Sequence, residues 1–147
     1  MSAISYLRAQ ERLCLSRIEE LTCVLDSLSD FRAEVARSSD RFRDQLAYKA
    51  NVARRAGGIS GMRTARRYAE HTVGYLTGEL DQVMSAGFFE VDAQASVATL
   101  RAEAELDEER ARLSSIRAEI ASERARERAE AARREAEGRL WRTGPYA

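Results

Sequence analysis

One glycine-rich stretch interrupts a sequence that otherwise favours helix along its length. Residues 54–67 read RRAGGISGMRTARR, and the single proline of the chain, Pro145, lies close to the C-terminus. Glycine ends helices because it adopts the left-handed cap conformation without steric cost, so we expect the first helix to end at Gly57 or Gly58. The stretch predicts a turn between two long helices, formed by Gly57, Gly58, Ile59, Ser60 and Gly61.

The composition favours an all-α fold with one domain. The chain has 147 residues, of which 33% are charged and only 7% aromatic. Abundant Ala, Arg, Glu and Leu with almost no proline is typical of long helices and coiled coils. No turn-bounded run alternates β-branched residues, so no strands are expected.

Before the turn, apolar residues follow the alternating three- and four-residue spacing of a coiled-coil seam. Glu11, Arg32 and Ser39 interrupt this row, whereas Leu13 and Phe31, together with Val24, widen it. A stripe this wide is typical of a helix that packs on more than one neighbour, so we expect a second chain to cover part of it. The row consists of Ile4, Leu7, Cys14, Ile18, Leu21, Leu25, Leu28, Val35, Phe42 and Leu46.

After the turn, Ser60 is the expected N-cap of a second helix with its own apolar row. The first helix, about 75 Å long, would reach back to about residue 115 of the second. We therefore expect an elongated antiparallel two-helix hairpin over residues 1–120 and a charged helical arm with a flexible tail over residues 121–147. The second row consists of Met62, Ala65, Ala69, Val73, Leu76, Leu80, Val83, Phe88, Val91, Ala95, Ala98, Ala102, Leu106, Leu113, Ile116 and Ile120.

The continuity of the second helix is open at this point. Gly74, Gly78 and Gly87 each cost about 1 kcal/mol relative to alanine inside a helix. They are compatible with tolerated glycines, with a helix break near Ser85, or with the close approach of a partner helix. We expect the partner to bind a central part of the two rows, made of Ile18, Leu21, Leu25, Leu28, Leu76, Leu80 and Val83.

Charge is segregated although the net charge is zero. Between Glu79 and Glu109 there are nine acids and one base, Arg101. Residues 49–67 contain no acid, and we call their basic residues the basic tip. We expect this tip to be a solvated surface or a docking site for an acidic partner. Nucleic-acid binding is the less favoured alternative because the acidic stretch lies on the same helix. The basic tip consists of Arg54, Arg55, Arg63, Arg66 and Arg67, preceded by Lys49.

The sequence contains no pattern that indicates catalysis, a metal site or a cofactor. Cys14 and Cys23 lie too far apart on one helix for a disulfide, and we expect both thiols to be reduced and buried. His71 is the only histidine, so no enzyme activity, metal, cofactor or small-molecule substrate is expected. The N-terminus lacks the apolar core of a Sec signal peptide and no run is long enough to span a membrane, which predicts a cytoplasmic protein.

Three short motifs, one at the turn and two on the second helix, resemble motifs of known helical proteins. Ile59-Ser60-Gly61 resembles the turn of the WXG family, the small helical-hairpin proteins of type VII (ESX) secretion, with Ile in place of Trp. Phe88 and Asp92 fit the F-x-x-x-D pattern of small helical partners of LXG toxins, and Tyr75 and Glu79 fit the Y-x-x-x-D/E export pattern. An aromatic residue and an acid four apart share one helix face. A core aromatic beside a solvated acid is the structural alternative for either pair.

The resemblance implies a non-enzymatic adaptor rather than an enzyme. LXG-associated helical proteins pair with the helical N-terminal domain of an effector toxin and guide it to the secretion machine. The expected partners are such a domain and, in addition, a second small helical protein, and the adaptor would be exported with them or remain in the cytoplasm. A self-assembling coiled-coil scaffold is the alternative that the same apolar rows allow.

Overall fold

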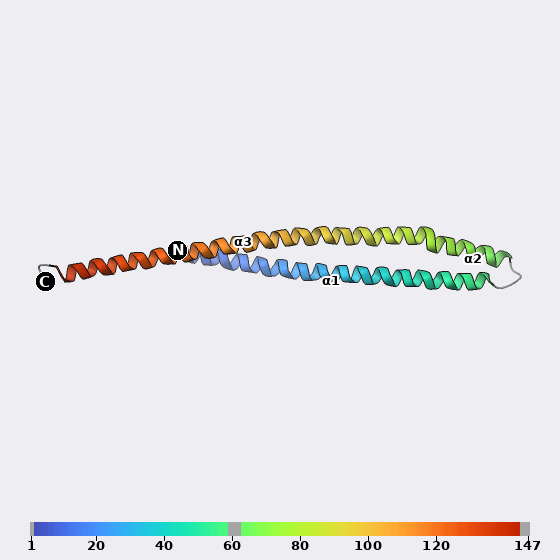
Figure 1. Cartoon of the computed structure of the whole chain (residues 1–147), viewed down its shortest axis with the longest axis horizontal. Helices are drawn as coiled ribbons and strands as arrows, with labels where there is room; N and C mark the ends of the chain where they lie inside the picture. The colour runs from blue at the N-terminus through green and yellow to red at the C-terminus, as the bar shows by residue number, and fades with distance from the viewer. Residues whose placement is uncertain (1, 59–62, 145–147) are drawn as a thin grey trace. The chain divides into compact units, whose positions relative to one another are not determined.

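The computed structural model describes residues 2–58 and 63–144 of the chain. In these two ranges every regular element is helical, which confirms the predicted all-α class. The elements are α1 (Ala3–Gly57), α2 (Arg63–Tyr75), a π-helical turn η1 (Leu76–Leu80) and α3 (Asp81–Arg142) (Figure 1). Ile59, Gly61 and the expected N-cap Ser60 lie outside the described residues, so the centre of the predicted turn stays a prediction.

The helices divide into two compact units. Unit 1 consists of two segments: Met1–Cys23, which contains the start of α1, and Ala102–Ala147, which contains most of α3. Unit 2 is the continuous stretch Val24–Arg101, which contains the rest of α1, α2, η1 and the start of α3.

Unit 1 has a narrow apolar core between α1 and α3. Cys14 packs with Leu113, Ile116 and Ile120, and Leu7 and Ile18 lie against this cluster. Two ion pairs join the same helices, each at 2.9 Å: Glu11 with Arg117, and Arg17 with Glu105. Because lower numbers on α1 meet higher numbers on α3, the two segments of unit 1 run antiparallel.

Unit 2 pairs its helices in the same antiparallel sense. The ring centroids of Phe42 and Phe88 are 6.0 Å apart. A Cβ added at Gly57 would lie only 2.6 Å from the Cβ of Ala69. Gly57 is therefore needed for the close approach of α1 to α2. The predicted end of α1 at Gly57 is confirmed, but neither Gly57 nor Gly58 has the left-handed φ that was expected of a cap.

The seam predicted on α1 matches the burial found in the structure. Side chains that are buried or half-buried recur every three or four residues from Ile4 to Leu46. Glu11 and Arg32, which interrupt the apolar row, are half-buried members of the seam and form ion pairs with the facing helix. The polar residues of the seam therefore also contact the facing helix, through ion pairs rather than apolar packing.

The predicted row on the second helix is wrong at Val83 and Val91, whereas its other described members from Ala65 to Ile120 are buried or half-buried. The two exceptions follow η1, where Gly78, Leu80 and Asp81 are all half-buried and the covered side of the helix moves by one residue, from Leu80 to Asp81. A π-turn allows such a shift because it holds one more residue than an α-turn. Val83 and Val91, which a continuous α-helix would place on the seam, are exposed, and Ser85, Phe88 and Asp92 are half-buried in their place.

The helix is continuous through residues 63–142, so the predicted alternative of a break near Ser85 is wrong. A Cβ at Gly74, Gly78 or Gly87 would have no neighbouring atom within 4 Å. Among the described residues, then, no helix approaches these glycines closely. Their remaining alternatives are tolerated glycine and the approach of another chain.

The end of α3 exposes almost all of its side chains. Ile120 is the last buried residue, and from Ala121 to Arg142 only Glu123 and Gly138 are half-buried. Ion pairs one turn apart, such as Arg139 with Glu135 at 2.7 Å, support the helix locally. Leu140 and Trp141 stand exposed near its end, and the Trp141 side chain is 88% exposed.

Candidate interaction site

Phe88 and Asp92, the first predicted export motif, both contact α1. Phe88 is half-buried and its ring packs against Phe42. Asp92 accepts hydrogen bonds from Arg32 Nε at 3.0 Å and from Arg32 Nη2 at 3.4 Å. The hydrogen bond from Arg32 lowers the pKa of Asp92, and the same bond raises the pKa of Arg32. This pair therefore has a structural role in unit 2, whether or not it also serves as an export motif.

Tyr75 and Glu79, the second predicted motif, are the more accessible pair. Tyr75 is the last residue of α2 and its side chain is 52% exposed, while Glu79 is exposed within η1. π-Turns inside helices are frequent at functional sites. Thr77 donates a hydrogen bond to the Val73 carbonyl oxygen at 2.7 Å, but Thr22 and Thr99 make the same contact in regular α-helix. The threonine alone therefore does not explain the π-turn.

The predicted partner-binding row is largely covered by the chain's own helices. Leu21 and Leu76 are buried, and Ile18 packs against the core of unit 1. Leu25, Leu28 and Leu80 are half-buried. Val83 alone is exposed, because the shift at η1 moves it away from the seam. A protein partner must therefore contact side chains beside the seam rather than the seam itself.

The sequence analysis missed an exposed apolar row along one side of unit 2, which we call the apolar flank. Each of its six members stands one position before a seam residue, as Phe31 does before Arg32 and Tyr75 before Leu76. Since the paired helices are antiparallel, the residues that precede the equivalent seam positions on each helix lie on the same side of the pair. The apolar flank consists of Val24 and Phe31 on α1, Tyr68 and Tyr75 on α2, and Met84 and Val91 on α3.

The opposite side of unit 2 carries mostly small or polar side chains. The residues that follow the other seam positions are Ser29, Ala36, Arg43, Gln82, Phe89 and Ser96. Phe89 is the only large apolar residue among them, and it is 77% exposed. The two sides of the helix pair therefore differ in hydrophobicity. The spacing of Val24 and Phe31 was visible in the sequence, but the matching residues after Leu76 could not be found without η1.

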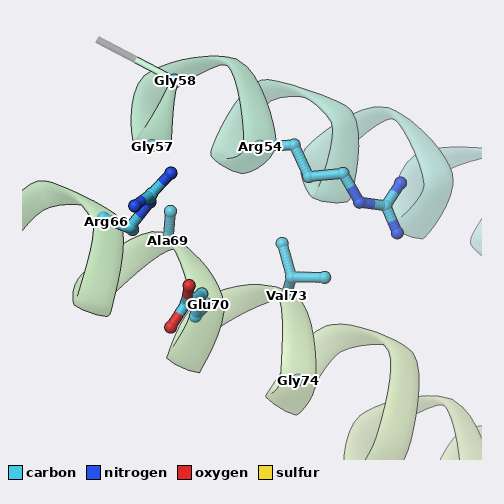
Figure 2. Close-up of a pocket in the computed structure, with 8 residues that line it drawn as sticks. All are labelled: Arg54, Gly57, Gly58, Arg66, Ala69, Glu70, Val73 and Gly74. Carbon is cyan, nitrogen blue, oxygen red and sulfur yellow. The ribbon is translucent and has the colours of Figure 1, made fainter. Parts of the chain in front are cut away.

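Two residues of the basic tip, Arg54 and Arg66, line an open pocket of about 520 Å³ in unit 2. Gly57 and Gly58 line it from α1, and Figure 2 shows the Arg66 side chain reaching from α2 towards Gly57. Glu70 also lines the pocket and offsets part of the positive charge of Arg54 and Arg66. The pocket combines glycine backbone, arginine and one carboxylate, which suits a protein surface of mixed charge better than a simple anion.

The two cysteines have different environments. Cys14 is buried, and its thiol lies 3.0 Å from Glu109 Oε2 and 3.1 Å from the Glu109 carbonyl oxygen. Burial, and then the hydrogen bond to Glu109, raises the pKa of Cys14. A thiol held protonated in a core is a weak nucleophile. Cys23 is exposed, so the expectation that both thiols are buried is wrong for this residue.

Within residues 2–58 and 63–144, no group of three or more His, Cys, Asp or Glu side chains is arranged to hold a metal ion. In the same ranges no helix has both the length and the hydrophobicity needed to cross a membrane. Searches of family models, curated proteins and solved structures found no match to this chain.

Proposed function

We propose that the protein is a non-enzymatic adaptor of type VII secretion, which pairs with the helical N-terminal domain of an effector toxin and helps to direct its export. The observation that carries this proposal is the exposure of large apolar side chains along helices that bury only one narrow seam. In unit 2 alone, Phe31, Tyr68, Tyr75 and Phe89 are all exposed. Exposed apolar rows of this kind mark protein–protein interaction sites.

The finer architecture that we propose is an antiparallel two-helix hairpin over residues 1–120, with residues 121–147 as a charged arm. The antiparallel pairing found within each unit supports it. The partner's helices would pack beside the seam and complete a helical bundle with the hairpin.

We assign the export motif to Tyr75 and Glu79. Phe88 and Asp92 become the second candidate, which reverses the order favoured by the sequence. Accessibility is the reason: a receptor can contact Tyr75 and Glu79 directly, whereas Phe88 and Asp92 are engaged with Phe42 and Arg32. The resemblance to the Y-x-x-x-D/E pattern and the position of Glu79 on a π-turn both support this assignment.

The experiment is a secretion assay in the source organism with single substitutions on α2 and η1. Glu79→Ala should reduce export of the toxin while leaving its binding to the adaptor intact. Glu70→Ala is the matched control, because Glu70 is also an exposed glutamate of the second helix but has no aromatic residue four positions before it. Equal export with both variants would remove Glu79 from the motif.

A self-assembling scaffold is the alternative function. The exposed apolar side chains of unit 2, such as Phe31 and Phe89, would also support self-assembly. Purified protein that forms long filaments, together with unchanged secretion after deletion of the gene, would favour the scaffold over the adaptor.

A further inference from the structure

The charges of unit 2 form a gradient along its helices. At the end where α1 meets α2, residues 49–67 carry six bases and no acid. At the other end, residues 24–36 and 89–101 carry five acids against two bases, a net charge of −3. The acids are Asp26, Asp30, Glu34, Glu90 and Asp92, and the bases are Arg32 and Arg101.

The apolar flank runs along the same unit between these two ends. Its members extend on the second helix from Tyr68, beside the basic tip, to Val91, beside the acidic end. Met84 lies near the middle of the second-helix part of unit 2, which covers residues 63–101. One surface therefore combines an apolar row with opposite charges at its two ends.

We propose that the apolar flank of unit 2 is covered by a second copy of this chain, packed antiparallel to the first about a twofold axis near Met84. A twofold interface brings the same patch of both copies together, so the patch must be complementary to itself. Antiparallel packing places the basic tip of each copy beside the acidic end of the other. Parallel packing would place twelve basic residues of the two tips side by side, which like-charge repulsion disfavours.

The dimer forms a four-helix bundle from two helix pairs, with the six apolar side chains of each flank between them. This gives a role to the six residues of the flank, whereas other exposed apolar side chains of unit 2, such as Tyr48, Val83 and Phe89, do not belong to it. The inference concerns the same unit as the proposed adaptor function but does not depend on it. In an adaptor, the second copy occupies the apolar flank until the partner's helices replace it.

Multi-angle light scattering of the full-length protein, measured over a range of concentrations, tests the dimer with a matched pair of phenylalanines. Phe31 is on the apolar flank and 49% exposed, whereas Phe89 is on the opposite side of unit 2. The wild type and Phe89→Ala should have twice the chain mass of 16.5 kDa. Phe31→Ala, and independently Met84→Glu, should weaken the dimer by about tenfold or more. Far-UV circular dichroism confirms that each variant keeps its helices.

Cysteine cross-linking tests the orientation in a Cys23→Ser background, which leaves only buried Cys14. Met84→Cys should form a disulfide between copies, because the two Met84 positions meet near the axis. Val24→Cys should not, because the two Val24 positions lie at opposite ends of the antiparallel dimer. Efficient cross-linking through Val24→Cys would contradict the antiparallel arrangement.

Two further outcomes would overturn the dimer. The first is a monomer at about 100 µM, a concentration at which a specific interface of this kind is occupied. The second is equal dissociation by Phe31→Ala and Phe89→Ala, which would show that the flank has no special role. A monomer that still exports its toxin would remove the dimer and leave the adaptor function in place.

Discussion

Arg32 and Asp92 form an ion pair across the two helices of unit 2, with Arg32 Nε 3.0 Å from Asp92 Oδ1. Both residues occupy seam positions, so a charged pair stands where two apolar side chains would otherwise meet. The pair fixes the register of α1 against α3, because a shift of either helix would separate the two charges.

The Arg32–Asp92 pair makes it possible to separate a structural role of Asp92 from a role in export. Asp92→Ala and Arg32→Ala both remove the ion pair, but only Asp92→Ala removes the carboxylate of the F-x-x-x-D motif. If Asp92 belongs to the export motif, Asp92→Ala should block secretion of the toxin whereas Arg32→Ala should allow it. Equal secretion with the two variants, measured beside their melting curves, would assign Asp92 to structure alone.

Acid should destabilise the protein through the same pair. The hydrogen bond from Arg32 holds the pKa of Asp92 below its ordinary value of 3.8, and Arg37 lowers the pKa of Glu34 from 4.5 in the same way. A carboxyl group whose pKa is lowered by folding stabilises the folded state above its unfolded pKa, and this contribution is lost as the pH falls through the folded value. Melting temperatures should therefore fall as the pH falls below about 4.5. Arg32→Ala should have a weaker dependence on pH in this range, and an unchanged dependence would contradict the assignment.

The core of unit 1 should be sensitive to truncation at Leu113. Leu113 is buried against Cys14 and Ile116, so Leu113→Ala should lower the free energy of unfolding by about 2–5 kcal/mol. Leu13 is the control, since it belongs to the same unit but is exposed. Leu13→Ala should change the free energy by less than about 0.5 kcal/mol in urea denaturation. Similar losses in both variants would mean that the seam is not where the structure places it.

The contact between Gly57 and Ala69 should not tolerate an added methyl group. Gly57→Ala should destabilise the protein by about 1–3 kcal/mol, because its Cβ would clash with the Cβ of Ala69. Adding Ala69→Gly removes the clash and should recover part of this loss. Gly87→Ala should instead stabilise the protein by up to about 1 kcal/mol, since that helical glycine has open space where a Cβ would lie. Thermal melts of the three variants check these signs.

The sequence predicts α1 well because one spacing rule applies from Ile4 to Leu46. It predicts the second helix less well just after η1, which adds one residue to a turn, although the predicted row from Ala95 to Ile120 is covered as expected. Val83 and Val91 were placed on the seam for that reason, although Phe88 was placed correctly. The extra residue of a π-turn cannot be recognised from spacing alone, because only the facing helix shows which side chains are covered.

The candidate site was less predictable than the fold. The motif residues could be named from their spacing, but their accessibility depends on contacts between distant segments. Asp92 and Arg32 are 60 positions apart in the sequence, and their pairing decides that Phe88 and Asp92 are less accessible than Tyr75 and Glu79. The apolar flank likewise requires the two antiparallel helices to be seen together.

The most direct test of the adaptor function is a quantitative comparison of secreted proteins with and without this chain. The gene is deleted in the source organism, and secreted proteins are measured by mass spectrometry beside a strain complemented with the wild type. The account predicts the loss of a large protein with a helical N-terminal domain from the secreted fraction, and its return on complementation. An identical set of secreted proteins in the three strains, under conditions in which the type VII system is active, would contradict it.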